Sequence, residues 1–493
     1  MGLRVTAALA HASFGEWTPD AGDRSGATEA LGVISRGGGY EPIPSPTPFQ
    51  DRLSSATTMV RGAACFYDGA GNPHIFFGDQ SKLYRLVNGE AVDVSGGTYS
   101  VDINTTWQFA QFGDNVVAVA PGQPTSRFRI GTSTEFEPLD GAPSGRCVAR
   151  VGDFLWIGND AGVTWCGYNN IEIWDPIPAY QSDSQTFDPS AGRTLAIVGG
   201  DYAAIFCERA IYRALYAGSP VIWNFGSDAI ETRRGIIAPN AAVKVGGTIY
   251  YASETGFFAF NGVQSQPVGQ NKVDRYFQSN LNYDYRLNTF AGYDASMNAV
   301  FFAFPSGGSY LPSEMLILSL TDGQWSHDFG EYDCLFELTH DRFTVDTIYP
   351  GFFSTNNLDS GDGISIDSES FRDSRRRLGA FNRNHELLSF TGGSRPATLA
   401  SAEVELAYGR RGWITELWPM ADAPATAMKA SVGYRTDPGG AVAYTSPTAM
   451  NACGFCPQRV EARFVRAKVD FAAGAIWKRA EGAHFAGRAT GWR

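Results

Sequence analysis

Residues 151–165 read VGDFLWIGNDAGVTW, and the first half of this stretch indicates the fold. A Gly-Asp pair at 152–153 follows an apolar residue and precedes the apolar run 154–157. Gly-Asp supplies the positive φ angles of a two-residue hairpin turn. A strand that is apolar on both faces suits an inner strand covered from both sides. The stretch therefore predicts a β-hairpin whose second strand is deeply buried.

The same pattern of an apolar residue, a turn and an apolar strand recurs along the chain at intervals of 39 to 48 residues. A period of about 40–50 residues built from short strands is typical of a β-propeller, in which four-stranded blades stack around an axis. The six copies span about residues 61 to 330 and are centred on Gly71, Gly113, Gly152, Gly200, Gly246 and Asp294.

The rest of the chain differs in character and sets the predicted domains. Residues 1–60 are rich in Gly, Pro and Ser, which predicts an extended arm with one strand. The aromatic residues Trp17, Tyr40 and Phe49 suggest that this arm packs against the rest of the protein. We assign 61–355 to a propeller of about six blades, 356–385 to a linker or partial blade, and 386–493 to a β-sandwich-like domain. Residues 349–368 fit either a seventh blade or a linker.

Composition restricts the function classes. The 493 residues include 56 Gly and only 18% charged residues, and the net charge is −12. This net negative charge argues against a protein that binds nucleic acid through a broad basic face. It is compatible with a negatively charged surface along which a polyanion slides without binding. Seven scattered Cys do not form a disulfide framework, and no run of about 20 apolar residues predicts a membrane span.

The second half of the opening stretch, GNDAGVTW, is one letter short of the Asp-box pattern S-x-D-x-G-x-T-W of sialidase-type propellers. Gly158 stands where that pattern has Ser, while Asp160, Gly162, Thr164 and Trp165 match it. A single imperfect copy predicts a plain hairpin in which the Trp packs between strands, and does not by itself indicate an enzyme.

Other candidate groups are few. A glycosidase needs two carboxylates across a pocket, and a sialidase also needs arginines that bind a carboxylate. Glu208-Arg209 and Asp274-Arg275 supply these residue types, but we expect them to be solvated or paired at blade rims.

Three further motifs do not match a defined site. Cys453 and Cys456 form a lone CxxC without a second ligand pair for zinc. The run Asp359, Asp362 and Asp367 departs from the EF-hand spacing, although adventitious Ca²⁺ binding there stays open. The run 375–377 of three arginines fits a linker or a phosphate or acidic partner. We predict no catalytic, cofactor-binding or metal-binding residues, and no enzymatic activity.

Several phrases in succession resemble a family of bacteriophage tail proteins. They are WTPDAGDRSGATEALGVISRGGGYEPIPSPTPF, then KLYRL, VDVSGGTY and WQFAQFGDNVVAV, and then GGDYAAIFCERAIYRALYAG, RRGIIAPNAAVKVGGTIYYASETGFFAFNG and VGQNKVDRYF. The ordered succession, which covers roughly 17–330, is similar to the tail hub or nozzle proteins of short-tailed phages, of the tail tubular protein B and DNA-stabilisation types. The C-terminal part matches less clearly.

The resemblance implies a virion protein that forms a ring, expected to be a hexamer, below the portal and adaptor proteins. Such a ring continues the channel for genomic double-stranded DNA without sequence-specific binding, retains the genome until ejection and anchors tail fibres or spikes. It implies assembly in the host cytoplasm, localisation to the virion tail, and no catalytic residues. The alternative is a propeller-type adhesin or glycosidase that acts on host surface polysaccharide.

Overall fold

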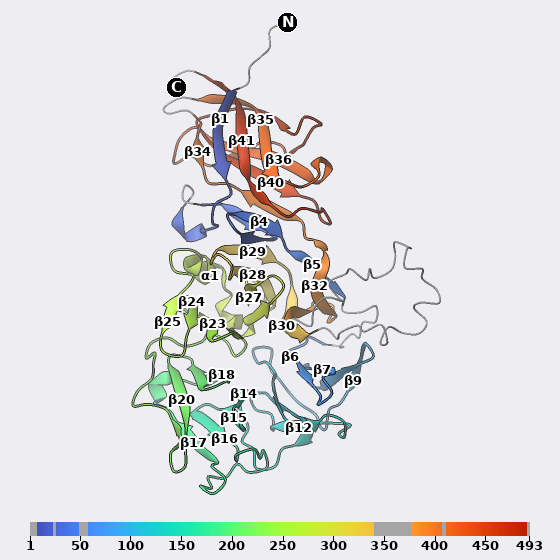
Figure 1. Cartoon of the computed structure of the whole chain (residues 1–493), viewed down its shortest axis with the longest axis vertical. Helices are drawn as coiled ribbons and strands as arrows, with labels where there is room; N and C mark the ends of the chain where they lie inside the picture. Colours follow the sequence, from blue (N-terminus) through green and yellow to red (C-terminus); the bar gives the residue numbers. More distant parts are fainter. Residues whose placement is uncertain (1–6, 23–25, 49–57, 340–375, 407–410, 491–493) are drawn as a thin grey trace, which may run out of the picture.

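A computed structural model gives the fold and describes residues 7–22, 26–48, 58–339, 376–406 and 411–490. Nearly all elements in these ranges are β-strands (Figure 1). A ring of small sheets occupies one end of an elongated body, and a β-sandwich occupies the other. The predicted all-β class with a propeller is therefore confirmed.

Among the described residues, seven antiparallel units of four strands, which we call blades, make up the ring; six are separate sheets and one is part of a larger sheet. Blade 1 consists of β6 (Ala63–Tyr67), β7 (Pro73–Gly78), β8 (Leu83–Val87) and β9 (Glu90–Asp93). Blade 2 consists of β10 (Gln108–Phe112), β11 (Asn115–Val119), β12 (Ser126–Arg129) and β13 (Glu137–Pro138). Blade 3 consists of β14 (Cys147–Val151), β15 (Phe154–Gly158), β16 (Gly162–Trp165) and β17 (Asp183–Thr186). Blade 4 consists of β18 (Thr194–Val198), β19 (Ala203–Cys207), β20 (Ile211–Gly218) and β21 (Ile222–Asn224).

The last three blades complete the ring. Blade 5 consists of β22 (Ala242–Val245), β23 (Thr248–Ser253), β24 (Gly256–Phe260) and β25 (Ser265–Pro267). Blade 6 consists of β26 (Phe290–Asp294), β27 (Ala299–Pro305), β28 (Pro312–Ser319) and β29 (Trp325–Phe329). Blade 7 consists of β30 (Tyr332–Thr339), β31 (Arg376–Asn382), β32 (Leu387–Ser394) and β5 (Pro44–Pro48). The first strand of each blade packs against the first strand of the next, and β30 packs against β6, which closes the ring.

The six sequence copies are the first hairpins of blades 1 to 6. Gly113, Gly152 and Gly246 have φ angles of 58°, 56° and 58°, in the left-handed region that glycine adopts without strain. The strand that follows Gly152, β15, is buried at every position. The turn chemistry and the buried second strand thus follow from the repeated pattern.

Blade 7 adds a unit to the six copies in the sequence. The residues between its first two strands, 340–375, lie outside the described ranges, and so do residues 349–368, for which a blade and a linker were both open. Its outermost strand, β5, comes from the arm and pairs antiparallel with β32. The first strand of blade 7 and this outer strand come from distant parts of the sequence. The pairing of β5 with β32 therefore attaches the N-terminal arm to the last blade of the ring.

The observed organisation divides the chain differently from the predicted ranges. The predicted boundary at residue 386 falls in the turn between β31 and β32, inside blade 7. Within the predicted linker or partial blade 356–385, the described part is β31 and that turn. The arm contributes five strands where one was expected.

The C-terminal unit is a sandwich of two sheets that also contain arm strands. One sheet holds β1 (Ala7–Ser13), β3 (Val33–Arg36), β4 (Gly39–Pro42), β35 (Gly412–Ala421), β39 (Cys456–Ala462) and β41 (Ala480–Ala489). The other holds β2 (Glu29–Leu31), β33 (Ala397–Ala400), β34 (Val404–Glu405), β36 (Met428–Arg435), β37 (Ala443–Tyr444), β38 (Thr448–Ala449) and β40 (Phe464–Phe471). Because β2 also pairs with β29, the second sheet runs on from blade 6 and joins the two units.

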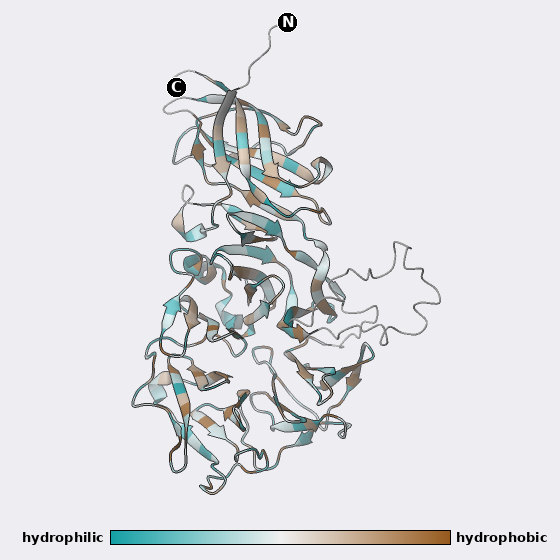
Figure 2. Cartoon of the chain, viewed as in Figure 1, coloured by the Kyte–Doolittle hydropathy of each residue, from teal (hydrophilic) through white to brown (hydrophobic). Residues whose placement is uncertain are grey.

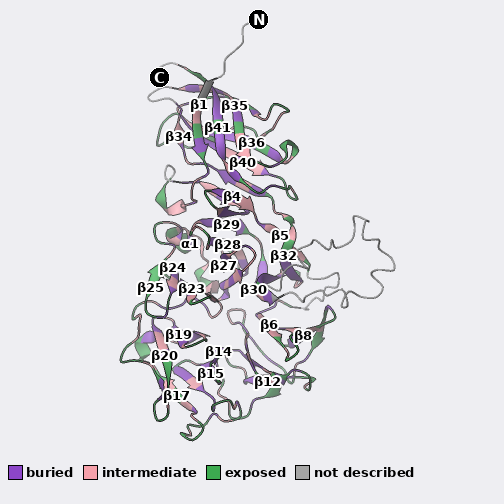
Figure 3. Cartoon of the chain, in the orientation of Figure 1, coloured by how far each residue is buried: buried purple, intermediate pink, exposed green. Residues whose placement is uncertain are grey.

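Burial follows the strand period of two in the sandwich. Residues of β39 alternate between buried and exposed along the whole strand, and hydrophobic and hydrophilic residues alternate along the sandwich strands (Figure 2). In Figure 3, buried residues follow the strands while exposed residues gather in turns. One face of β39 therefore joins the core and the other faces solvent, whereas β40 is buried or half-buried along its whole length.

The arm is fixed by buried aromatic residues and a carboxylate. Trp17 and Tyr40 are 2% and 1% exposed, as the sequence suggested, whereas Phe49 lies outside the described residues. The Trp17 ring stacks on His327 of blade 6 with centroids 4.3 Å apart. Asp20 accepts hydrogen bonds from the first backbone N–H groups of α1 (Asp274–Asn280), a short helix between blades 5 and 6. Helix N–H groups that lack internal partners are thus satisfied by the arm.

Candidate functional site

The Asp-box-like residues form the turn between β15 and β16 in blade 3. The Asn159 side-chain oxygen accepts hydrogen bonds from the backbone N–H groups of Ala161 and Gly162, each at 2.9 Å. Trp165 is buried, and its indole N–H donates to the Gln181 carbonyl at 2.9 Å. Asp160, the residue that gives the Asp-box its name, is exposed and ion-paired with Arg146. The turn is held by Asn159, so its geometry is that of a structural hairpin.

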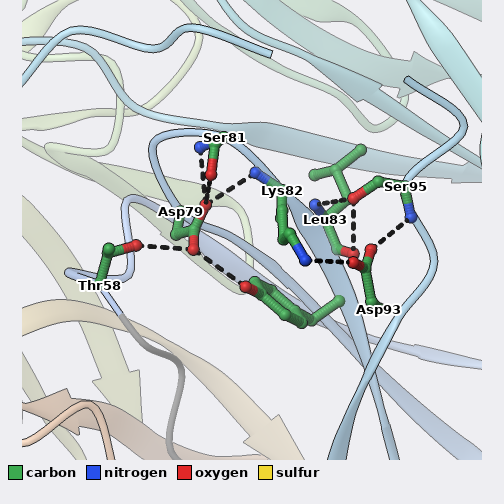
Figure 4. Close-up of polar contacts among 8 residues, drawn as sticks. Thr58, Asp79, Ser81, Lys82, Leu83, Asp93 and Ser95 are labelled. Carbon is green, nitrogen blue, oxygen red and sulfur yellow. Dashed lines mark hydrogen bonds and ion pairs between the residues drawn. The ribbon is translucent and has the colours of Figure 1, made fainter. Parts of the chain in front are cut away.

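An equivalent turn joins β7 and β8 in blade 1, and the sequence analysis did not identify it. Figure 4 shows Thr58, Ser81 and Lys82 around Asp79, whose Oδ1 accepts the backbone N–H groups of Ser81 and Lys82 at 2.7 Å. Its Oδ2 accepts the Thr58 and Tyr84 hydroxyls at 2.6 and 3.0 Å. Asp79 is 1% exposed, so these bonds satisfy a buried carboxylate. The shared signal is an Asp or Asn directly after a strand-ending glycine, in GDQS and GNDA.

Replacing Asn159 by alanine should lower the free energy of unfolding by about 1 kcal/mol, because two backbone N–H groups lose their acceptor. Replacing the neighbouring Asp160 by alanine should change it by less than about 0.5 kcal/mol, because that side chain is exposed. Urea denaturation of both variants measures the difference. A larger loss for Asp160→Ala would show that the carboxylate, not the amide, holds the turn.

Glu208 lies in the corresponding turn of blade 4 and is paired. The Arg193 guanidinium donates to Glu208 Oε1 through Nε at 2.8 Å and Nη2 at 2.5 Å. Burial raises the pKa of Glu208, but the hydrogen bonds and charge of Arg193 outweigh it, so the net pKa is lowered. In blade 3 the hydrogen bond from Arg146 likewise lowers the pKa of Asp160. A general acid at neutral pH needs a raised pKa, so neither carboxylate is suited to that role.

Asp274 is a different case. Burial, with a smaller contribution from the charge of Asp20, raises its pKa to about 6, although the hydrogen bond from the Phe257 backbone lowers it. Its Oδ1 accepts the Phe257 backbone N–H at 3.1 Å, while Arg275 donates its own backbone N–H to Asp20. Asp20, which accepts the helix N–H groups, therefore attaches the arm to the helix, whereas Asp274 binds the helix to blade 5. Within the described chain, Glu208-Arg209 and Asp274-Arg275 make no hydrogen bond or ion pair with one another.

The CxxC pair is split between two environments. Cys453 is exposed, Cys456 is buried in β39, and both thiols are free. Burial raises the pKa of Cys456 to about 11, which keeps it protonated and unreactive at neutral pH. In the described ranges, no three His, Cys, Asp or Glu side chains converge to hold a metal ion.

Of the remaining sequence candidates, Arg376 and Arg377 lie in the described residues, both in β31 of blade 7. Asp359, Asp362, Asp367 and Arg375 lie outside the described residues. Arg376 pairs with Glu337 at 3.1 Å, and Arg377 is buried in β31. The described arginines therefore belong to a strand, and do not form an exposed linker.

The propeller axis is narrow and crossed by a hydrogen bond. The Gln108 amide of blade 2 donates to the Asn240 side-chain oxygen, next to blade 5, at 3.0 Å. The remaining cavity is about 200 Å³ and is lined by first-strand residues such as Ala63, Ile197 and Phe336. A cavity of this size is too small for a nucleic-acid duplex, whose major groove alone is about 12 Å wide.

Exposed tyrosines lie close together on blades 3 and 4. We call Tyr168, Tyr180 and Tyr216 the tyrosine surface; they are 48% to 52% exposed. The Tyr216 hydroxyl donates to the Gln181 amide oxygen at 2.7 Å, and both Tyr168 and Tyr216 contact the buried Phe154 ring. These rings are held in place although they face solvent. β17 and β20 lie at the end of the molecule away from the sandwich (Figure 1).

A cleft of about 490 Å³ opens beside this surface, between the outer parts of blades 3 and 4. It is lined by Phe187, Tyr212 and Phe225 together with Asp188 and Asp228. The Phe187 and Tyr212 rings stack with centroids 4.1 Å apart. Aromatic rings next to carboxylates are typical of sites that bind polar ligands with an apolar face.

Comparisons with known proteins assign no family to this chain. No protein-family model matches the chain, and no curated protein matches it. The extracellular domain of a protein named as a one component system of B. thetaiotaomicron aligns over 82% of this chain and 47% of its own length, at 10% identity and a TM-score of 0.41. YCF48, solved with a D1 peptide bound, aligns over 70% of this chain and 98% of its own length, at 10% identity and a TM-score of 0.35. None of the helices in the described ranges has the length and hydrophobicity to span a bilayer.

Proposed function

We propose that this chain is a structural protein of a phage tail that works as one subunit of a ring-shaped hub or nozzle. The proposal starts from the ordered succession of phrases over residues 17–330 that resembles that family. In this role the ring, expected to be a hexamer, continues the DNA channel below the portal and adaptor proteins, retains the genome and anchors fibres or spikes. The protein is then part of the virion and not an enzyme.

The tyrosine surface is the observation that best supports a role in an assembly. Tyrosine is enriched at protein interfaces because a large, stiff ring buries much area at low entropy cost while its hydroxyl stays hydrogen-bonded. Here several such rings are already immobilised on two blades, so binding a partner costs little additional ordering. Low overall charge fits the same role, because interface cores are depleted of charged residues.

The narrow propeller axis limits where DNA would pass in such a ring. Since Gln108 and Asn240 cross the axis, a channel for duplex DNA has to lie between subunits. Residues 61–394 carry 37 acidic and 22 basic side chains, a net charge of −15, whereas 395–493 carry 8 acidic and 13 basic ones, a net charge of +5. A wall built from propellers would repel phosphates and let DNA slide.

The second candidate is a glycan-binding adhesin or glycosidase. The cleft lined by Phe187, Tyr212 and Asp188 favours binding, because sugars present both an apolar face and hydroxyl groups. Hydrolysis is less favoured, because Asp160 and Glu208 are paired with arginines and have lowered pKa values. A propeller-type fold fits this candidate as well as the first.

Native mass spectrometry and negative-stain imaging of the purified chain separate the two candidates. We expect closed rings of identical subunits with a central channel. Replacing Tyr168 and Tyr216 together by serine should weaken assembly or partner attachment, whereas the matched control Tyr444→Ser, an exposed tyrosine on the sandwich, should not. A monomer at tens of micromolar that binds polysaccharide would refute the tail role and support the second candidate.

A further inference from the structure

Two histidines lie side by side on the outer face of the sandwich. His11 of β1 and His484 of β41 are direct cross-strand partners, and their ring centroids are 4.7 Å apart at an interplanar angle of 45°. Both side chains are exposed, while their chain neighbours Ala12, Ala483 and Phe485 point into the core. The strand alternation therefore fixes both imidazoles on the same solvent-facing surface.

We propose that His11 and His484 form a two-ligand site for a divalent transition metal such as Ni²⁺, Cu²⁺ or Zn²⁺. Imidazole nitrogen is a preferred ligand of these ions. Two imidazoles on adjacent strands are already positioned, so binding does not have to bring distant groups together. Since the described residues hold no group of three or more such ligands, water completes the coordination.

The site has a structural consequence for the arm. Among the described strands, β1 pairs with β41 only, and this pairing is interrupted by a register shift between Ala8 and Ala10. A metal ion held by both histidines cross-links the first described strand to the last one. Because the metal binds the paired state and not the detached strand, it stabilises that pairing by mass action. This inference is independent of the tail role.

The ring–ring contact itself offers a different explanation, because cross-strand aromatic pairs stabilise a sheet without any ligand. The two explanations separate in His11→Phe. Phenylalanine keeps a ring beside His484 but has no nitrogen to bind a metal. Stability without metal should then be retained in His11→Phe, while metal binding should be lost.

The test is calorimetric titration of Ni²⁺ into the full, untagged chain in a Cys453→Ser background, because Cys453 is an exposed thiol. We expect the parent chain to bind one Ni²⁺. His11→Gln and His484→Gln should each weaken Ni²⁺ binding at least about tenfold, and His11→Phe should weaken it to the same extent. His74→Gln in blade 1 is the matched control and should bind normally. Saturating Ni²⁺ should raise the melting temperature of the parent and of the His74 variant only.

Three results would overturn the proposal. One is the absence of binding by the parent chain at millimolar Ni²⁺. Another is unchanged affinity after either histidine at the site is replaced. The third is an equal loss in His74→Gln, which would mean that scattered histidines bind the ion adventitiously.

Discussion

Replacing Trp156 by alanine should lower the free energy of unfolding by about 3–5 kcal/mol, the range found when a buried aromatic side chain is removed. Trp156 is fully buried in β15, the second strand of the repeated hairpin in blade 3. Its ring stacks on Trp165 with centroids 5.0 Å apart and meets Trp223 of blade 4 edge-on at 4.9 Å. Removing it therefore opens a cavity between two blades, and urea or guanidinium denaturation measures the loss.

Two matched variants make this test specific. Trp156→Phe keeps most of the ring and removes the indole N–H, which has no hydrogen-bond partner in the described structure, so its loss should be clearly smaller. Trp418→Ala removes a tryptophan that is 36% exposed on the sandwich, and should also cost far less. Equal losses for Trp156→Ala and Trp418→Ala would contradict the tight packing between blades 3 and 4.

The sequence predicted the hairpins well because their determinants are local. Gly113, Gly152 and Gly246 each supply a left-handed residue where the turn needs one, and an apolar strand follows. Blade 7 could not be found in the same way. Its outer strand β5 precedes blade 1 in the sequence, and its pairing with β32 spans more than 300 residues. Such pairing depends on the closure of the whole ring, which no local pattern encodes.

The candidate-site residues also divide into features that local sequence predicts and features that only tertiary structure determines. The hairpin nature of GNDAGVTW could be predicted, since Asn and Gly are turn residues. The equivalence of Asp79 and Asn159 was missed because the letters around them differ, although both side-chain oxygens accept two backbone N–H groups. The pairing of Glu208 with Arg193 was expected only as a general possibility for blade rims, because tertiary structure alone brings the two together.

Replacing Glu403 by alanine should destabilise the sandwich by about 3–5 kcal/mol, because two buried guanidinium groups would lose their shared carboxylate. The Glu403 side chain is 2% exposed and lies 2.5 Å from Arg435 Nε and 3.8 Å from Arg466 Nη2. Arg435 also donates to Glu403 Oε1 at 2.9 Å. A buried cation without its partner is costly, since water cannot replace the lost charge. Glu403→Gln keeps the shape but not the charge and should fall between the parent and Glu403→Ala.

Glu405, two residues away, provides the control. It pairs with Arg463 at 2.8 Å, but the two side chains are 28% and 40% exposed. Solvent screens such a pair, so Glu405→Ala should cost about 0–1 kcal/mol. Guanidinium denaturation followed by circular dichroism compares the two variants in one chain. Equal losses of unfolding free energy in Glu403→Ala and Glu405→Ala would mean that burial does not determine how much these ion pairs stabilise the protein. They would also mean that the Glu403 carboxylate does not hold β36 and β40 to the segment between β33 and β34.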